Sequence, residues 1–462
     1  MSTLSGIMNT SLSALQTYQV AIDVTGSNIA NANTDGYSRQ TVDINTTQTL
    51  SSSYGYLGTG VEASEVKRVS DAYVLKQLNS AAGESGELEV DLKYLESVEA
   101  VLDESEGSGL NEALGEFFCA WQDLANDPTG STERSILVSE AEALTVVFND
   151  MYSDLQEVRE GIDDDIAAMV EEINGISEQI ADLNRQILQA ENSNQDTNTL
   201  KDSLDSLVTK LSALVEIGTY ESESGQINVQ LADGSPLVSG SQSWSLGTET
   251  NSTTGLQDVT WVDTAGNARV ITEGLTGGKV GGALEVRDEV IPEYLDNLDE
   301  LASEIMEQVN TLHTSGYDIN GDAGGSLFTG TGAGDMAVNQ DIIDDPGLLA
   351  AAETSDGAPG DSSNAIAIAA LQKSTLMDGG TTTFEEYYSS LVSAIGTLVE
   401  NTESSHEYQS GMVDFYNNYR ESISGVSLDE ETANLVLYQM AYEAAAKVIS
   451  VLDEILETVL NM

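Results

Sequence analysis

Two histidines, one cysteine and many carboxylates are the side chains of this sequence that could catalyse a reaction or bind a metal ion. His406-Glu407 begins the His-Glu-x-x-His pattern of zinc hydrolases, but Ser410 stands where the second histidine ligand belongs. Cys119, with His313 and His406 far apart in the chain, does not supply the four ligands of a structural zinc site. The sequence therefore predicts no catalytic residues and no metal site, and it indicates that the protein is not an enzyme.

Two Gly- and Asp-rich stretches resemble ligand-binding loops in part. Asp318–Asp322 matches the first three ligand positions of a calcium loop, but Ala323 and Thr329 replace the required Gly and bidentate Glu. Gly330–Asp335 resembles a phosphate-binding loop, yet no strand precedes it and no lysine is nearby. Both stretches are predicted to be surface turns, so no cofactor is expected, and ion binding at Asp318–Asp322 stays open.

The single cysteine excludes an intrachain disulfide. Cys119 lies between Phe118 and Ala120 in the apolar segment 116–121, which has the pattern of a helix. Free cysteines in such a context usually behave as small hydrophobic residues rather than as reactive thiols. We therefore predict that the Cys119 side chain is buried.

The charge of the chain excludes two classes of partner. Its 462 residues include 16 lysines and arginines against 78 aspartates and glutamates, a formal net charge of −62. Nucleic acids and anionic membrane surfaces both require a basic face on the protein. The acidity is consistent with a saline habitat, and equally with a solvated surface alone.

Targeting signals are lacking in this sequence. It has no unbroken run of 18 apolar residues, which predicts that no segment inserts into a membrane. Residues 1–16 contain no lysine or arginine and no continuous apolar core, so they do not form a Sec signal peptide. The protein is expected either to stay in the cytosol or to leave it by a route without such a signal.

Apolar residues recur at steps of three and four along most of the chain, which is typical of long amphipathic helices. We predict helices over residues 64–102, 110–125, 132–190, 200–214, 284–314, 363–377 and 383–424. A helix over 132–190 would be roughly 88 Å long at about 1.5 Å per residue, which is too long for a compact globule. The polar turn at 192–199 predicts that the chain then doubles back as a helical hairpin.

Residues 219–283 have a different pattern, with short alternating runs separated by Gly, Asp and Pro turns, which predicts a β-rich domain. Residues 41–63 are also predicted to be extended, and 315–362 to form a Gly/Asp-rich loop. The predicted fold is therefore mainly α with a β insert. Its expected parts are a terminal coiled-coil domain (1–63 and 425–462), a helical-bundle domain (64–218 and 284–424) and a β-rich outer domain (219–283).

Both ends of the chain carry heptad patterns over 3–33 and 428–459, which predict long helices with an apolar seam. One helix cannot bury such a seam alone, so the two ends are expected to pair as a coiled coil or to contact neighbouring molecules. The predicted assembly interface consists of Leu4, Met8, Leu15, Tyr18, Ile22, Ile29, Leu428, Leu435, Tyr438, Tyr442, Ala445, Ile449, Leu452, Leu456 and Val459.

The segment NIANANTDGYSRQ (28–40) follows the first heptad helix, and Gly36 suits a left-handed turn after a helix end. This segment resembles the N-terminal signature of bacterial flagellar axial proteins, the family of rod, hook and hook-associated proteins. Residues 424–462 are similar to the C-terminus of its hook-associated members, and 316–328 and 384–396 fit the same family. The signature residues are Asn28, Asn31, Asn33, Gly36, Tyr37 and Arg39.

The resemblance implies a structural subunit of the flagellum that joins hook to filament and allows the filament to assemble. Its terminal helices would line a helical tube of identical subunits, where the signature asparagines would suit contacts between neighbours and Arg39 would meet an acidic group. Implied partners are further copies of the chain, the hook protein, the next hook-associated junction protein and a cytosolic export chaperone on the C-terminal helix. The implied location is the extracellular flagellum, reached through the flagellar channel.

Two alternatives stay open. The first is another axial subunit, such as a hook, distal rod or filament protein, although Tyr37–Gln40 and Ser427–Glu430 favour a hook-associated member. The second is a secreted adhesin or enzyme on a flagellar-type scaffold, with its activity in 219–283. That segment has no recognisable site in its sequence, so the structural function is favoured over the second alternative.

Overall fold

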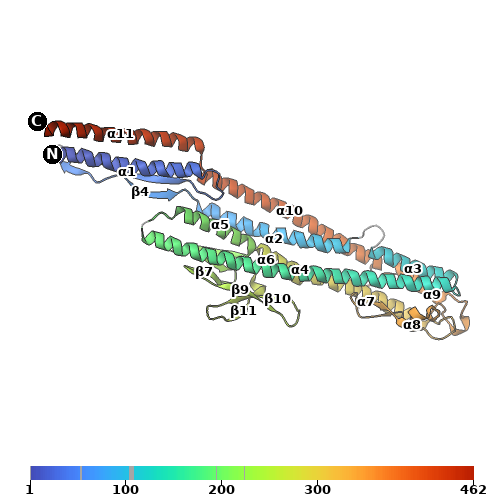
Figure 1. The fold of residues 1–462 in the computed structure, drawn as a ribbon. Helices are drawn as coiled ribbons and strands as arrows, with labels where there is room; N and C mark the ends of the chain where they lie inside the picture. Colours follow the sequence, from blue (N-terminus) through green and yellow to red (C-terminus); the bar gives the residue numbers. More distant parts are fainter. Residues whose placement is uncertain (1, 53–54, 104–108, 194, 223, 462) are drawn as a thin grey trace.

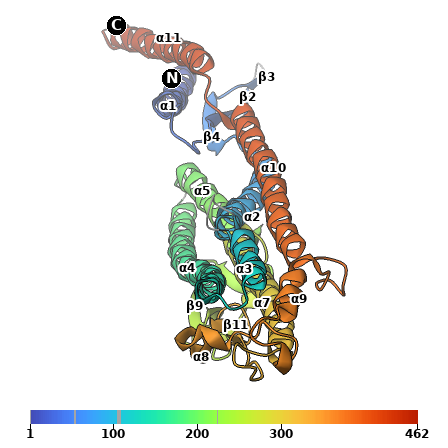
Figure 2. The same ribbon diagram turned by 90° about the vertical axis from the view of Figure 1, so that its right-hand side faces the viewer.

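The fold is elongated, and both chain termini lie at the same end of the molecule (Figure 1). This computed structural model describes residues 2–52, 55–103, 109–193, 195–222 and 224–461. A long helical bundle fills the middle of the molecule, and short helices and loops fill the end opposite the termini. In the view of Figure 2, the terminal helix pair stands apart from the bundle.

The bundle is built around one long helix, α4 (Ser131–Asn192), which has 62 residues. Its buried side chains recur every three or four residues from Leu137 to Ile187, as the sequence pattern predicts. Helix α5 (Asn198–Leu214) packs back against α4, so the predicted hairpin is confirmed. The other bundle helices are α2 (Ala72–Leu102), α3 (Leu110–Asn126), α6 (Gly278–Glu285), α7 (Ile291–Ser315) and α10 (Phe384–Ser424), and a π-helical turn, Val286–Val290, joins α6 to α7.

The β insert consists of two small antiparallel sheets, in agreement with the predicted fold class. The first sheet has the order β5 (Ile217–Glu221), β6 (Ile227–Leu231), β7 (Pro236–Ser239), β8 (Gln242–Ser243). The second has β10 (Gln257–Val262) between β9 (Ser245–Thr250) and β11 (Ala268–Val270). The sheets lie along α4 on the side away from α10 (Figure 1).

Three polar side chains of α4 hold the backbone of the insert. Asp163, Asn174 and Asn184 are about three helical turns apart, so they lie on one face of the helix. The Asn174 side chain accepts a hydrogen bond from the Leu246 N–H (2.7 Å) and donates one to its carbonyl (2.8 Å). Asn184 pairs in the same way with Ile227 (2.9 and 2.7 Å). Each side-chain amide therefore takes the place of a neighbouring strand.

Replacement of Asn184 by alanine is expected to lower the free energy of unfolding by roughly 2–3 kcal/mol, because buried backbone groups of the insert lose their partners. Asn184 also donates to the Gly240 carbonyl (2.8 Å), so three hydrogen bonds are lost together. Faster amide exchange at Ile227 would report the change. Gln179→Ala is the matched control, since Gln179 is exposed on the same helix; equal effects of both variants would contradict the prediction.

The terminal part of the molecule contains α1 (Ser2–Ala30), α11 (Leu428–Leu460) and a hairpin of β1 (Gln40–Thr46) and β4 (Val61–Arg68). Two short strands, β2 (Leu50–Ser52) and β3 (Gly55–Leu57), form the tip. The prediction that a helix begins at Ser64 is wrong, because Ser64 lies in strand β4, which pairs with β1, and helix α2 begins at Ala72. The alternation of Val61, Ala63 and Val66 with charged residues fits a strand.

The segment after α7 is a structured loop with short elements: β12 (Phe328–Thr329), β13 (Ala337–Val338), α8 (Gln340–Asp344) and α9 (Ser363–Ala369). The helix predicted over 363–377 is shorter than expected, since a 3₁₀ turn, Ala370–Lys373, follows α9. The turn at Asp318–Asp322 is confirmed: the Asp318 carboxylate accepts the N–H groups of Asn320 and Asp322 (2.8 and 2.9 Å).

The prediction that Cys119 is buried is wrong. Phe117, Phe118 and Trp121 of α3 fill the core, but the Cys119 side chain is exposed on the opposite face. The apolar run 117–121 is longer than the width of the buried face of α3. One residue of the run therefore points to solvent, and the sequence does not show which one.

Candidate assembly interface

The two terminal helices lie side by side and antiparallel, as the heptads predict (Figure 1). The Tyr18 and Tyr438 rings meet across the pair, with their centroids 6.3 Å apart. The predicted interface residues that are half-buried or buried in the described structure are Leu4, Leu15, Tyr18, Ile22, Ile29, Leu435, Tyr438, Tyr442, Ala445, Ile449 and Leu452. The pairing leaves Met8, Leu428, Leu456 and Val459 exposed, and their role in assembly stays a prediction.

α1 packs against the β1–β4 hairpin as well as against α11. Its most buried residues are Thr17, Ala21, Thr25 and Asn28, which are small or polar. The Thr17 hydroxyl donates to the Val61 carbonyl of β4 (3.2 Å). Residues of this kind allow close approach between a helix and a strand.

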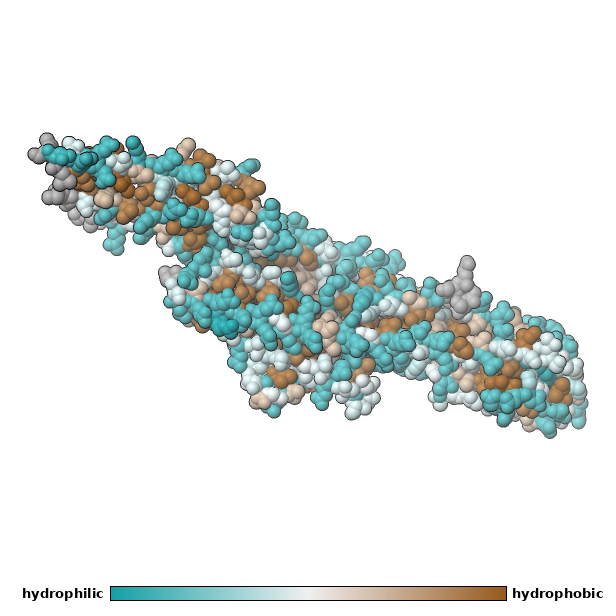
Figure 3. Space-filling view, viewed as in Figure 1, coloured by the Kyte–Doolittle hydropathy of each residue, from teal (hydrophilic) through white to brown (hydrophobic). Residues whose placement is uncertain are grey.

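A second apolar face of the terminal helices has no partner within the described chain. Figure 3 shows hydrophobic residues gathered on the surface of the α1–α11 end. Exposed members of this face are Ile7, Met8, Leu12, Val436, Leu437, Met440, Val448, Val451, Ile455 and Val459. Exposed apolar surface of this extent is typical of an interface with other molecules.

By length and composition, one helical span passes the test for a membrane segment. Within Phe384–Val459 an 18-residue window has a mean hydropathy of 1.3, and 6% of that window is buried. The sequence has no unbroken run of 18 apolar residues, so this window is apolar on average rather than continuously, and the absence of a membrane segment stays a prediction. The same apolar surface fits contacts with other protein helices, as heptad spacing predicts.

Asn28 is the centre of the signature segment. It is 1% exposed, and its side chain donates to the Gln40 carbonyl (2.8 Å) and to Glu431 of α11 (3.0 Å). Its oxygen accepts the Gln40 N–H and the Tyr37 hydroxyl, both at 2.9 Å. Burial raises the pKa of Tyr37, and the nearby Asp202 charge acts in the same direction, so the hydroxyl keeps its proton and donates.

Other signature residues also act within the chain. Arg39 forms an ion pair with Glu430 (3.1 Å), so the acidic neighbour expected for it belongs to the C-terminal helix. The Asn31 side chain donates to the Ser27 carbonyl (3.0 Å), while Asn33 is exposed. Gly36 has a φ of +79°, which confirms the left-handed turn, although α1 already ends at Ala30. Asn28 and Asn31 therefore make contacts within this chain, and their contacts between subunits stay a prediction.

A cluster that sequence reasoning missed fixes the signature to the bundle. Arg68 of β4 forms ion pairs with Asp202 (3.0 Å) and Asp205 (2.6 Å) of α5, and Asp202 also accepts the Ser38 N–H (3.0 Å). Asn198 donates to the Val66 carbonyl (2.9 Å). Two signals in the sequence could have predicted the ion pairs of Arg68. Cations are rare in this chain, and Asp202 and Asp205 are one helical turn apart.

A polar cleft of about 580 Å³ separates the signature turn from the α4–α5 hairpin. Its lining includes Asn31 and Tyr37 on one side, and Asp182, Gln186 and Asp202 on the other. The terminal part contacts the bundle beside this cleft, through the bonds of Arg68, Ser38 and Asn198.

Replacement of Asn28 by alanine is expected to loosen the terminal pair by roughly 2–4 kcal/mol, because four hydrogen bonds are lost in a buried site. Amide exchange at Gln40 and along α11 measures this loss. Asn33→Ala is the matched control, since Asn33 is exposed in the same signature. Unchanged protection of Gln40 in the Asn28 variant would contradict the prediction.

Among the described residues, one set of three carboxylate side chains has the spacing of metal ligands. One ligand oxygen from each of Glu87, Asp91 and Glu285 lies within 4.8 Å of the others. Burial, and then the charges of Glu285 and Glu87, raise the pKa of Asp91 to about 7. A proton on Asp91 near neutral pH relieves the repulsion in this cluster, so we assign no ion to it.

These features define a class of protein: an elongated axial subunit whose two chain ends pair and present apolar surface for assembly. Models of three protein families match the chain. The flagellar hook-associated protein FlgK helical domain matches residues 95–328, the flagellar basal body rod FlgEFG protein C-terminal region matches 420–462, and the flagella basal body rod protein matches 8–37.

Relatives match over nearly the whole chain. Flagellar hook-associated protein 1 of Bacillus subtilis (strain 168) is 30% identical, covering 100% of this chain and 98% of that protein. Flagellar hook-associated protein 1 of Escherichia coli (strain K12) is 28% identical, covering 99% of this chain and 100% of that protein. The flagellar hook junction protein FlgK from Burkholderia pseudomallei has a similar fold, with a TM-score of 0.66 and 18% identity over 75% of this chain and 100% of that one. The chain belongs to the flagellar hook-associated protein 1 family, whose members are structural proteins of the bacterial flagellum.

Proposed function

We propose that this chain is a structural subunit of the junction between the flagellar hook and the filament, and that it allows the filament to assemble. The observation that carries this proposal is the terminal helix pair, in which Asn28 and Arg39 of the signature bind α11 while a second apolar face remains uncovered. A surface of this kind suits contacts with further copies and with neighbouring axial proteins. The match to hook-associated relatives over nearly the full chain supports the junction role.

The assembly that we propose is a helical tube of identical subunits. The terminal part would line its interior, the helical bundle would surround that part, and the β insert would face the solvent. Such contacts are heterologous, because each copy uses one surface toward the copy before it and another toward the copy after it. The proposed partners are copies of this chain, the hook protein and the next junction protein.

Export is a finer part of the proposal. The chain would leave the cell through the flagellar channel, and a cytosolic chaperone would cover the C-terminal helix before export. The exposed apolar side chains of α11 give a physical reason for such a chaperone, since they would otherwise associate in the cytosol. Catalysis has no place in this proposal, and neither does a cofactor.

A deletion strain tests the junction role. We expect electron micrographs of hooks without filaments, together with unpolymerised flagellin in the medium. Re-expression of the chain should restore filaments. Missing hooks would place the protein in the rod or hook instead, and normal filaments would contradict the proposal.

A further inference from the structure

One face of α10 is aromatic and exposed over its last five turns. Phe415 and Tyr419 stack with their ring centroids 6.2 Å apart, and Tyr408 is exposed two turns before Phe415. Five of the six phenylalanines in the chain are at most 2% exposed, whereas Phe415 is 56% exposed. We define the aromatic strip as the exposed residues Ser404, Tyr408, Gly411, Phe415, Tyr419 and Ser422, which recur at steps of three and four.

The strip is distinct from the face by which α10 joins the bundle. α10 packs along α2, where Gln409 is buried and donates to the Ala81 carbonyl (3.4 Å) and Tyr416 contacts Gln77 (3.5 Å). Gly411 lies between Tyr408 and Phe415 and has open space where a side chain would be. The strip therefore presents aromatic rings on either side of a shallow notch, which suits insertion of an apolar side chain from another molecule.

Charge is segregated from the strip. About one residue in six of the chain is acidic, yet the strip contains no carboxylate. The acidic residues of this part of α10, Glu403, Glu407, Asp414 and Glu421, recur at steps of four and seven, so they share a neighbouring face. An apolar centre with a charged rim is the usual composition of a protein interface.

The charge of the chain decides which partner fits. A basic partner would be attracted to the acidic faces of the molecule rather than to a strip without charge, and a membrane surface would require cations. Two copies of this chain, each with a net charge of −62, repel one another and can meet closely only where carboxylates are missing. The strip is such a surface.

The position of the aromatic strip also favours a second copy of this chain as the partner. The strip ends at Ser422, six residues before Leu428 begins the exposed apolar side chains of α11. Figure 1 shows α10 leading directly to the terminal pair. A copy that docks on the terminal helices can therefore extend its contact along α10.

We propose that the aromatic strip of α10 is a contact surface for an adjacent copy of this chain, in addition to the terminal helices. The proposal rests on the proposed self-assembly at the junction and adds the location of one contact outside the terminal part. Tyr408, Phe415 and Tyr419 are its anchors, and Gly411 keeps the notch open.

Photo-cross-linking in assembled flagella tests the proposal. The photoreactive residue p-benzoylphenylalanine replaces Phe415 in the full chain, and flagella are isolated from the complemented deletion strain and irradiated. We expect a species of twice the 49.0 kDa chain mass. The same replacement at Tyr220, which is 55% exposed on β5, is the control and should give no such species.

The outcomes separate this inference from the proposed function. The inference alone is overturned if the chain is present in isolated flagella but position 415 cross-links to another protein or to nothing. The same holds if position 415 cross-links no better than position 220. A chain that is absent from isolated flagella overturns the proposed function, and the inference falls with it.

A charge variant gives a second measurement. Phe415→Asp places a carboxylate in the strip, and we expect incorporation into flagella to fall roughly 30-fold or more, as for an anchor residue of an interface. Its circular dichroism and melting temperature should stay unchanged because the side chain is already exposed. Phe415→Leu should retain incorporation, and Tyr220→Asp should behave like the unmodified chain. Equal incorporation of Phe415→Asp and the unmodified chain would overturn the inference.

Discussion

Replacement of Arg287 by alanine is expected to lower the free energy of unfolding by roughly 3–5 kcal/mol, because it leaves a carboxylate buried without its partner. Arg287 is 2% exposed in the π-helical turn between α6 and α7. It pairs with Asp163 of α4 (2.6 Å) and with Asp288 (2.7 Å), and it donates to the Gln257 carbonyl of β10 (2.8 Å).

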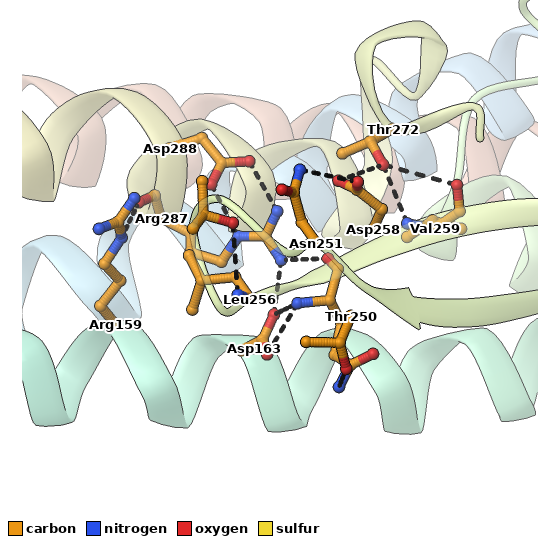
Figure 4. A network of polar contacts seen from close by, with 12 residues as sticks. Arg159, Asp163, Thr250, Asn251, Leu256, Asp258, Val259, Thr272, Arg287 and Asp288 are labelled. Carbon is orange, nitrogen blue, oxygen red and sulfur yellow. Dashed lines mark hydrogen bonds and ion pairs between the residues drawn. The ribbon is translucent and has the colours of Figure 1, made fainter.

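The network around Arg287 joins three parts of the molecule (Figure 4). Asp163 also accepts the Gln257 N–H (2.9 Å), and the Arg287 carbonyl accepts a hydrogen bond from Arg159 (2.9 Å). Loss of the guanidinium therefore separates the turn after α6 from both α4 and β10, and among the described residues it leaves the Gln257 N–H as the remaining partner of the Asp163 carboxylate. Lysine is not an adequate substitute, because its single ammonium cannot reproduce the planar set of donors.

The loss of stability in Arg287→Ala is measured by thermal unfolding, monitored by circular dichroism. Limited proteolysis of residues 245–270 reports on the insert. Arg269→Ala is the matched control: Arg269 lies in the same insert, but its ion pair with Asp233 (3.0 Å) is largely exposed. Exposed pairs contribute about 1 kcal/mol or less. If Arg287→Ala unfolds no earlier than Arg269→Ala, the network does not stabilise the insert as we infer.

Acid is expected to destabilise the far end of the molecule through His313. This side chain is fully buried; its Nδ1–H donates to the Gly325 carbonyl (2.6 Å), and its Nε2 accepts the Ala350 N–H (3.0 Å). The bond from Ala350 requires an unprotonated Nε2, so it is lost when the ring gains a proton, whereas the charged ring can still donate to Gly325. Burial, with a smaller contribution from the Arg134 charge, lowers the pKa of His313 to about 4, from 6.5 in the unfolded chain.

The sign of the pH effect follows from these two values. A folded-state pKa below the unfolded one contributes stability that is complete above pH 6.5 and is lost as the pH falls toward 4. The contribution lost by pH 4.5 is about 2–3 kcal/mol, at about 1.4 kcal/mol per unit. The loop between α7 and α9 should loosen first, because both partners of His313 lie in it.

Comparison of the chain with His313→Gln between pH 7 and 4.5 isolates this contribution. The glutamine variant starts less stable at pH 7, because it fills the site less well, but it should lose about 2–3 kcal/mol less on acidification. His406→Gln, which removes the other histidine of the chain, is the control variant. Parallel profiles of the unmodified chain and His313→Gln would contradict the prediction.

Much of the fold was predictable because it depends on periodicity. The apolar steps of α4, the heptads of α1 and α11 and the alternation in the β insert each reflect the geometry of one local element. Polar contacts between distant elements were not predictable in this way. Arg287 with Asp163, and Arg68 with Asp202, are paired by the packing of helices and strands, and one sequence does not reveal which of 78 carboxylates each cation meets.

The signature segment, residues 28–40, also shows that contacts between distant elements are not predictable from one sequence. Its resemblance to axial proteins identified Asn28, Gly36 and Arg39 as residues of interest, but not what they contact. The structure shows that Asn28 and Arg39 bind Glu431 and Glu430 of α11 in the same chain. The strand at Ser64 was missed because a short strand with charged residues on one face has little apolar signal.

The hydrogen bond from Asn28 to Glu431 joins residues 403 positions apart. During translation, the N-terminal helix therefore lacks its helical partner α11 until almost the entire polypeptide has left the ribosome. A prematurely terminated product that lacks α11 leaves Asn28 without Glu431 and Arg39 without Glu430. The two ends thus act together as a built-in check of completeness, since only an intact chain can close its own terminal pair.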